Sequence, residues 1–450
     1  MSDYEMDVSH DSSSENEEEV GKAEDDQNMD TQSSKTTPKT EVYLPGKPLE
    51  DGEELTCDPS AYVMYHQAQT SAPCLSFDII PDSLGENRET FPMTAYIVAG
   101  TQAPQSHVNN LIVMKLSNLD KTSKNEDSDN EDEDELSDEE DEANGPKMAG
   151  ALIKHQGCVN RIRSTVINNS VLAASWSELG RVNIWDLTPQ LQAVNSSQVL
   201  AKYNKDNKQN SFTPLFMFNG HTTEGFAMDW SPTISGLLAT GDCRKDIHLW
   251  NPSEGTTWKV DQRPLVGHEE SVEDLQWSPN ERNVLASCSV DKSIRIWDTR
   301  ANPSKACMIT CERAHDTDVN VISWNRNEPF IASGGDDGFL HVWDLRTFQQ
   351  KTPLATFKHH IGPLTTVEWH PTDSAVFASG GADNQIALWD LSVEKDSETE
   401  TEDIKDVPPQ LLFIHQGQNN IKELHWHRQL PGVIISTAES GFNIFRTISV

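Results

Sequence analysis

The chain has 450 residues and a formal net charge of −37, and a chain this acidic is a poor direct binder of nucleic acid because phosphates would be repelled. Its N-terminus has neither the basic start nor the apolar core of a signal peptide, and no apolar run approaches the roughly 20 residues that cross a bilayer. Seven cysteines, an odd number without a disulfide framework, favour a reducing compartment such as the cytosol or nucleus.

The negative charge is concentrated in three stretches. Residues 1–40 hold 12 acidic and 3 basic side chains, residues 120–147 hold 14 and 3, and residues 392–406 hold 7 and 2. Dense like charge with few apolar groups cannot bury enough surface to offset the entropy of ordering the chain. We therefore expect a disordered acidic tail at 1–40 and disordered acidic loops at 120–147 and 392–406.

The segment 41–74 carries a helix signal and precedes any repeat. Asp58 is a good N-cap residue, and Pro59 suits the first position of a helix. This pattern predicts a helix over about 59–69.

From residue 75 onward, a short motif that contains tryptophan recurs. Its members LWNP, IWDT, VWDL and LWDL place tryptophans 47, 46 and 46 residues apart, namely Trp250, Trp297, Trp343 and Trp389. Trp185 lies 65 residues before the first of these, which fits an inserted loop at about 188–213, and Phe445 takes the same slot 56 residues after the last. A period slightly above 40 residues that ends in Trp-Asp is typical of a β-propeller blade.

Seven units can be counted, so the expected fold is all-β, a seven-bladed WD-repeat propeller over 75–450. A closed ring of sheets leaves only short, protected edges, and we expect the last strand of the chain to complete the circle. The acidic loop 120–147 then falls between the first and second blades. The units are 75–116, 148–187, 214–251, 263–299, 308–346, 354–391 and 411–447.

Ser, His and Asp recur together in three units, in a grouping that could suggest catalysis. A catalytic triad occurs once, whereas this set repeats beside a tryptophan indole, so we interpret it as a hydrogen-bond tetrad within each blade. In the unit of His221 and Thr240, Arg244 stands at the aspartate position, so we expect that tetrad to be incomplete. The other sets are Ser287, His268 and Asp291; Ser333, His315 and Asp337; and Ser379, His360 and Asp383.

Enzyme motifs are missing from the sequence, which has no P-loop, nucleophile elbow or HExxH. Cys307 and Cys311 form one C-x3-C pair without a second pair, which favours buried thiols over a metal site. We expect no catalytic residue, no metal and no cofactor.

Several motifs resemble one family of proteins. APCLSFDI, GHTTEGFAMDWSP, DQRPLVGHEESVEDLQWSP, SKACMIT and FRTISV look like the glutamate-rich WD-repeat family, and the likeness covers nearly the whole chain. The resemblance implies a factor for large-subunit ribosome assembly in the nucleus and nucleolus, with the cytoplasm as an alternative. It also implies a chaperone of the third large-subunit ribosomal protein, and histone binding has been ascribed to the family. We expect a monomer that binds basic proteins and neither nucleic acid nor membrane.

The acidic loop suggests how a basic client would be held. Free ribosomal proteins and histones are strongly basic, so a tethered polyanion would shield such a client and speed its encounter with the propeller. The sequence does not decide between the two clients. The expected residues of this acidic arm are Glu126, Asp127, Asp129, Glu131, Asp132, Glu133, Asp134, Glu135, Asp138, Glu139, Glu140, Asp141 and Glu142.

A second binding element follows from resemblance to the histone-binding WD-repeat proteins. There, a helix before the first blade and an acidic loop that ends in Pro-Pro form a side groove that grips a basic helix. The corresponding residues here are Tyr62, Met64, Tyr65, Glu398, Glu400, Glu402, Asp403, Pro408 and Pro409. The loops that carry the repeat histidines offer an alternative acidic surface, formed by Glu224, Asp242, Glu269, Glu270, Asp316, Asp318 and Asp336.

Three serines of the acidic stretches are expected phosphorylation sites. Ser14, Ser128 and Ser137 each have an acidic residue three positions later, which acid-directed kinases prefer, and each phosphate would add about −1.5 to −2 of charge.

A different function class is also open. The WD-x-R motif of substrate receptors for cullin-RING ubiquitin ligases occurs in two consecutive units. In that alternative, Arg300 and Arg346 would contact the ligase adaptor. A scaffold without a basic client is the third interpretation.

Overall fold

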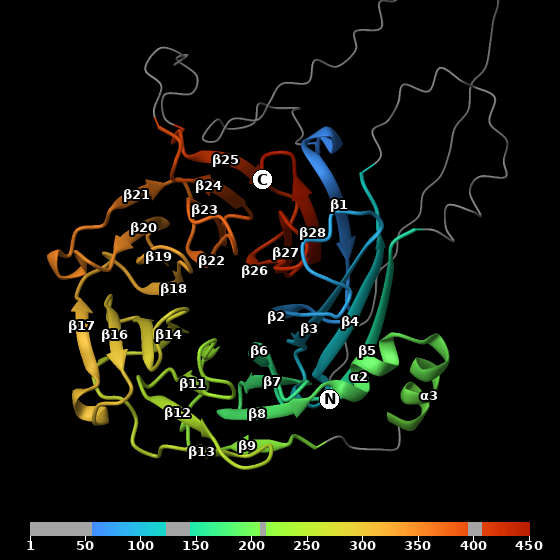
Figure 1. The fold of residues 1–450 in the computed structure, drawn as a ribbon, viewed down its shortest axis with the longest axis horizontal. Helices are drawn as coiled ribbons and strands as arrows, with labels where there is room; N and C mark the ends of the chain where they lie inside the picture. Colours follow the sequence, from blue (N-terminus) through green and yellow to red (C-terminus); the bar gives the residue numbers. More distant parts are fainter. Residues whose placement is uncertain (1–55, 123–144, 208–212, 395–406) are drawn as a thin grey trace, which may run out of the picture. The chain divides into compact units, whose positions relative to one another are not determined.

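The computed structural model describes residues 56–122, 145–207, 213–394 and 407–450, in which seven four-stranded sheets follow one another around a ring (Figure 1). The expected seven-bladed WD-repeat propeller is confirmed. Neither described α-helix is long and apolar enough to span a membrane.

Each sheet is one blade, and its first strand lies nearest the ring axis (Figure 1). Blades 1 and 2 consist of β2 (Cys74–Ile80), β3 (Met93–Thr101), β4 (Asn110–Leu119), β5 (Lys147–Lys154), and β6 (Val159–Ile167), β7 (Ser170–Ser177), β8 (Arg181–Asp186), β9 (Phe216–Phe218). Blades 3 and 4 consist of β10 (Ala227–Trp230), β11 (Leu238–Gly241), β12 (Ile247–Pro252), β13 (Trp258–Val260), and β14 (Val272–Trp277), β15 (Val284–Ser289), β16 (Ile294–Asp298), β17 (Cys307–Cys311).

The remaining blades complete the ring. Blades 5 and 6 consist of β18 (Val319–Trp324), β19 (Phe330–Gly335), β20 (Phe339–Asp344), β21 (Ala355–Lys358), and β22 (Leu364–Trp369), β23 (Val376–Gly381), β24 (Ile386–Asp390), β25 (Leu411–His415). Blade 7 consists of β26 (Ile421–Trp426), β27 (Val433–Ala438), β28 (Gly441–Thr447) and β1 (Tyr62–Ala68). Four short 3-10 turns are also described, η1 (Pro59–Ala61), η2 (Ser106–Val108), η3 (Pro303–Lys305) and η4 (Phe348–Gln350).

The core is divided into seven apolar clusters, one at each junction between neighbouring blades. Small residues let the sheets approach one another. A Cβ on Gly100 of blade 1 would lie 2.2 Å from Val159 of blade 2, a distance that only glycine allows. Each blade therefore buries its apolar surface against two neighbours.

The tryptophan that ends the inner strand joins a blade to the preceding one. The indole nitrogens of Trp230 and Trp277 donate to the carbonyl oxygens of Arg163 and Asp229, both at 3.0 Å. Trp369 and Trp426 bond the preceding blade in the same way. These buried donors are therefore satisfied across junctions rather than within a blade.

The repeated Ser, His and Asp residues form the expected tetrads. In blade 4, His268 is 2.8 Å from Asp291 and 2.7 Å from Ser287, whose hydroxyl also accepts the indole N–H of Trp297 at 2.8 Å. Blades 5 and 6 repeat the arrangement with the residues predicted. The set is thus a structural network that ties the second and third strands to the loop before the first.

The tetrad of blade 3 is complete, which corrects the expectation from Arg244. Asp242 supplies the carboxylate, 2.9 Å from His221, and it also accepts the backbone N–H of Arg244 at 2.9 Å. The aspartate stands two residues earlier than in other blades because it organises the turn from its first position. In blade 2, the Gly157 carbonyl, 2.9 Å from His155, replaces the aspartate.

The predicted helix over 59–69 is wrong. Asp58 does cap a turn with Pro59 at its start, but that turn, η1, ends at Ala61. The chain then forms strand β1, which pairs with β28 at the C-terminal end of the chain and closes the ring. The capping signals hold locally, but the open edge of β28 takes up the alternating residues that follow as a fourth strand. The propeller therefore begins at Tyr62 rather than at residue 75.

The sequence units are offset from the blades by one strand, because each unit contributes the outer strand of the blade before it. The segment 120–147 consequently lies within blade 1, between β4 and β5, and not between blades 1 and 2. The segments 188–213 and 392–406 likewise join the third and fourth strands of blades 2 and 6. Since strands alternate in direction, all three connections leave the same face of the ring, here called the insertion face. The opposite face, called the histidine face, carries the tetrad loops.

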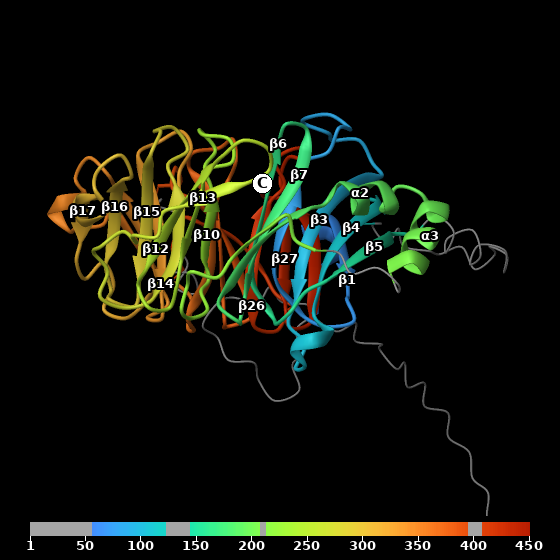
Figure 2. The ribbon, with the colours of Figure 1, turned by 90° about the horizontal axis from the view of Figure 1, so that it is seen from below.

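The connection at 188–213 is helical, although a plain loop was expected. Its helices α2 (Thr188–Val194) and α3 (Ser197–Asn207) are rich in Leu, Gln, Ala and Lys, which favour helix. Both helices lie against the outer part of blade 1 (Figure 2). The hydroxyl of Tyr203 donates to the Leu152 carbonyl at 2.8 Å and helps fix them there.

Met64 tests the role of β1 in ring closure. Its side chain is fully buried in the cluster between blades 7 and 1. We expect Met64→Ala to lower the free energy of unfolding by about 2–5 kcal/mol, because it leaves a cavity at the closing junction. Gln67→Ala, on the exposed side of the same strand, should change it by less than about 0.5 kcal/mol. Equal effects in urea titrations of the two variants would contradict this assignment of β1.

Candidate protein-binding surface

The two segments that were expected to form a side groove do meet at the outer rim of the ring. Tyr62 of β1 is nearly buried, with its ring 5.4 Å from that of Phe413 in β25 and its hydroxyl 2.8 Å from His415. Tyr65 stacks on Tyr62 at 5.1 Å and stays partly exposed. Met64 points into the core, so it cannot contact a partner, which corrects its assignment to the groove.

An apolar strip covers this junction between blades 6 and 7. Its residues are partly exposed and pack on the buried cluster below them. Pro408 and Pro409 lie at the turn that starts β25, and Pro409 is exposed. The apolar strip is formed by Ala61, Tyr65, Leu412, Phe413 and Val450.

His415 holds the strip from beneath. Its ring stacks on Phe445 at 4.0 Å, and Asn443 donates to its Nε2 at 2.9 Å. The other nitrogen must then carry the proton and donate to Tyr62. Burial lowers the pKa of His415 to about 3, so the ring is neutral in the folded protein.

The acidic connection of blade 1 starts and ends beside the same strand. The backbone N–H of Thr122 donates to the Val63 carbonyl at 3.1 Å, and His66 donates to the Asp120 carbonyl at 2.9 Å. Asn118 donates to the Gly145 carbonyl at 3.4 Å, so the two ends of the connection are held together. The acidic arm is therefore tethered next to β1.

The acidic connection of blade 6 is tethered in a similar way. The Gln410 amide donates to the Val393 carbonyl at 2.8 Å, which joins its two ends at the start of β25. Both acidic connections thus begin at fixed points on either side of the apolar strip.

The charged residues predicted for client binding lie outside the described residues. This applies to all thirteen of the acidic arm, to the expected phosphorylation sites Ser14, Ser128 and Ser137, and to the groove acids Glu398, Glu400, Glu402 and Asp403.

The histidine face is acidic but loses one of its predicted members. Asp242 is fully buried in its tetrad and is a structural residue. Asp336 accepts from Asn320 at 2.8 Å, while burial and the charge of Asp336 raise the pKa of Asp318. The remaining acids of this face line the mouths of the tetrad loops and stay an alternative surface.

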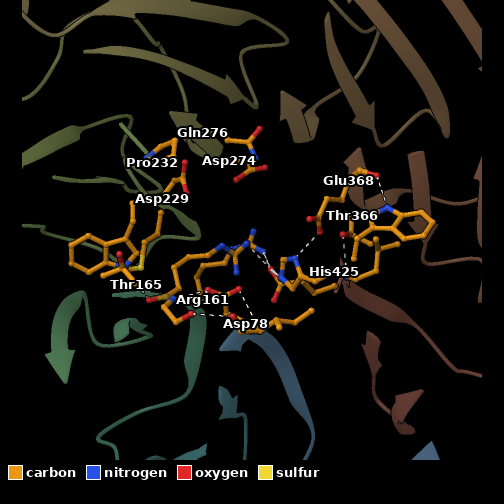
Figure 3. A pocket seen from close by; sticks show the side chains of 18 of the residues that line it. Asp78, Arg161, Thr165, Asp229, Pro232, Asp274, Gln276, Thr366, Glu368 and His425 are labelled. Atoms are coloured by element: carbon orange, nitrogen blue, oxygen red, sulfur yellow. Dashed lines mark hydrogen bonds and ion pairs between the residues drawn. The ribbon is translucent and has the colours of Figure 1, made fainter. Parts of the chain in front are cut away.

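A polar network crosses the channel along the ring axis (Figure 3). Glu423 accepts from Arg161 at 2.8 Å and Arg163 at 2.7 Å, and despite burial these two arginines hold the pKa of Glu423 well below its usual range. His425 lies 2.8 Å from Glu368, and although burial opposes it, the charge of Glu368 raises the pKa of His425 to about 10. The network binds the inner strands of blades 2, 6 and 7, which sequence reasoning missed because its members come from distant repeats.

The two WD-x-R arginines are exposed on the insertion face. Arg300 pairs with Asp298 at 2.6 Å, and Arg346 pairs with Asp344 at 2.7 Å, each within its own motif. No group of three or more His, Cys, Asp or Glu in the described ranges is arranged to hold a metal ion.

Comparison with known proteins gives two matching families. The family described as histone-binding protein RBBP4, or a component of the CAF1 complex, matches residues 52–120. The family described as WD domain, G-beta repeat, matches residues 260–298, 306–344 and 351–390. The first match spans β1 to β4 and ends where the acidic connection of blade 1 begins.

Curated relatives cover most of the chain. Ribosome assembly protein rrb1 of Schizosaccharomyces pombe is 44% identical over 446 residues, which is 96% of this chain and 88% of the relative. Protein HEAT STRESS TOLERANT DWD 1 of Arabidopsis thaliana is 44% identical over 435 residues, 91% of this chain and 92% of its own. Glutamate-rich WD repeat-containing protein 1 of Dictyostelium discoideum is 43% identical over 413 residues, 89% of this chain and 83% of its own.

The neutral ring of His415 predicts a loss of stability in acid. The unfolded chain protonates this residue near pH 6.5, whereas the folded protein does so only near pH 3, so the unfolded state binds more protons between these values. Stability should therefore fall as pH drops from 7 to 5, by about 2 kcal/mol from this residue.

Urea unfolding at pH 7 and pH 5 measures this effect. In His415→Gln the difference between the two pH values should shrink by about 2 kcal/mol, whereas His107→Gln, at an exposed site, should keep the full difference. An unchanged pH dependence in His415→Gln would show that another group controls the acid response.

Proposed function

Because the chain belongs to the glutamate-rich WD-repeat family, we propose that it is a non-enzymatic chaperone that holds a strongly basic protein during assembly of the large ribosomal subunit. The third large-subunit ribosomal protein is the first candidate client, and core histones are the second. The proposed location is the nucleus and nucleolus, where both would be met.

One observation carries the proposal. The apolar strip lies between the fixed ends of two acidic connections, so a partner seated on it has apolar contacts beneath and negative charge on both sides. An amphipathic basic helix fits such a surface, since it presents one apolar and one charged face.

The relatives support the assembly role. One of them is named as a ribosome assembly protein and is 44% identical over 96% of this chain. The histone-binding family matches the segment that contains β1, which supports histones as the second candidate client.

The two parts of the surface should contribute differently. Charge on a tethered acidic arm attracts a basic partner over long range and raises its association rate. The strip acts only at contact, so it would determine which partner stays bound. Because the strip is apolar, its contribution should resist salt.

The acidic arm can be tested by removing charge without removing residues. We replace the thirteen acidic residues of 126–142 by Asn and Gln and compare this variant with one in which the 12 acidic residues of 1–40 are neutralised. We expect the first change to lower the association rate of the ribosomal protein by about tenfold or more and the second to lower it less, because only the arm is fixed beside β1. Stopped-flow binding at about 0.1 M salt measures both.

Two controls accompany this test. The melting temperature of both variants should equal that of the unchanged chain, since the arm is not part of any described strand. Raising salt from about 0.1 to 1 M shortens the screening length from about 10 to 3 Å and should remove the difference between the variants. Crosslinks of the client to the histidine face alone would refute the rim as its site.

A second candidate function, recognition by a cullin-RING ligase adaptor, is favoured by one observation. Arg300 and Arg346 stand at equivalent positions of adjacent blades, with about two-thirds of each side chain exposed. Both are already paired with an aspartate, so an adaptor would have to share these pairs.

Co-purification tests this alternative. If the chain is a substrate receptor, Arg300→Ala with Arg346→Ala should abolish adaptor recovery from cell extract and leave recovery of the ribosomal protein unchanged. Arg263→Ala, which removes an arginine paired with Asp261 outside a WD-x-R motif, is the matched control. Adaptor recovery that is equal in all variants would exclude these arginines as the contact.

A further inference from the structure

The mouth of the central channel on the insertion face is built from one repeated position. Two residues after the tryptophan that ends the inner strand, blades 3, 4 and 6 have proline, namely Pro232, Pro279 and Pro371. The strand register of blades 1 and 2 puts Pro81 and Val166 at this position. Blades 5 and 7 differ, because they have Arg326 and Arg428.

This ring of residues encloses a cavity of about 340 Å3. Four of its members, Pro81, Val166, Pro232 and Arg428, line the cavity wall. Deeper in the channel lie Asp229, Asp274, Glu368 and the Glu423 network, with Asp229 and Glu368 on different blades that face the axis (Figure 3).

The two arginines of the ring have no partner within the described part of the chain, since neither guanidinium has a hydrogen bond or ion pair to a described residue. Other arginines near the channel are neutralised. Arg88 pairs with Asp82 at 2.7 Å, and Arg161 and Arg163 share Glu423. Arg428 is exposed at the mouth, but Arg326 is partly buried. A partly buried arginine without an acceptor is unfavourable, because its donors lose water without gaining a hydrogen bond.

The two unpaired charges also act on one another. Burial lowers the pKa of Arg326, and the charge of Arg428 lowers it further. The carboxyl groups nearby compensate little. Glu368 is already paired with His425, and burial raises the pKa of Asp229 to about 7, so that group is only partly charged at neutral pH. The mouth therefore carries an excess of positive charge in a very acidic protein.

We propose that this mouth is a binding site for an oxyanion, held by Arg326 and Arg428 from two blades. Planar guanidinium groups bind phosphoryl and carboxylate oxygens through paired hydrogen bonds, and a cavity of this size admits a small phosphorylated molecule or a few acidic side chains. The apolar prolines around the mouth exclude water and strengthen the contact. The phosphoryl group is favoured, because its two negative charges match the two arginines.

The site is distinct from the surface proposed for the basic client. It lies on the ring axis and binds the opposite charge, whereas the apolar strip lies on the outer rim. Its test therefore stands or fails independently of the proposed chaperone function.

Calorimetric titration of the full chain tests the site with three probes, namely pyrophosphate, citrate and a synthetic peptide with the sequence of residues 126–142. We expect pyrophosphate to bind and to raise the melting temperature, as any ligand of the folded state does. Arg326→Gln with Arg428→Gln should weaken its affinity by about tenfold or more. Arg282→Gln, which removes an exposed arginine in the β14–β15 turn on the same face, should leave it unchanged.

The probes separate the possible sources of the oxyanion. Arginine-dependent binding of pyrophosphate identifies a phosphoryl site, whereas arginine-dependent binding of citrate or of the acidic peptide alone identifies a carboxylate site, with the peptide pointing to the chain's own acidic arm. Arg326→Lys with Arg428→Lys keeps the charge and should bind each probe more weakly than arginine does. The proposal is overturned if no probe binds, or if the double Gln variant melts normally and still binds equally well.

Discussion

Every blade of this propeller depends on its two neighbours for burial, because no other layer covers the sheets. The seven apolar clusters all lie at junctions, and the indole bonds of the inner-strand tryptophans cross the same junctions. A blade on its own would expose two apolar faces and several unsatisfied donors. Stability therefore belongs to the closed ring, and its last junction, where β1 pairs with β28, is as necessary as the other six.

That requirement also explains where sequence reasoning succeeded. The tryptophan spacing and the recurring Ser, His and Asp report interactions inside one repeat, so the seven blades and three of the tetrads could be predicted. Asp242 was missed because a turn of different geometry moved the carboxylate by two residues. The inserted segments were placed between blades because the strand offset between units and blades is not visible in a single repeat.

Where distant parts of the chain meet, the sequence was less informative. Asp58 and Pro59 start a turn as their chemistry demands, but only the free edge of β28 makes the next residues a strand. On that strand Met64 faces the core and Tyr65 faces outward, an alternation that a helix would have hidden. Arg326 and Arg428 stand out only when the inner strands of all seven blades are aligned in space.

Ring closure by the two ends of the chain has a consequence for synthesis. The strand made first waits for the strand made last, so the propeller cannot close until almost the whole chain has left the ribosome. At about 5–20 residues per second this interval lasts on the order of tens of seconds. During it β1 exposes Met64 and an unpaired edge, features that favour aggregation. The acidic stretches at 1–40 and 120–147 are also made early, and their charge would keep such an unfinished chain soluble.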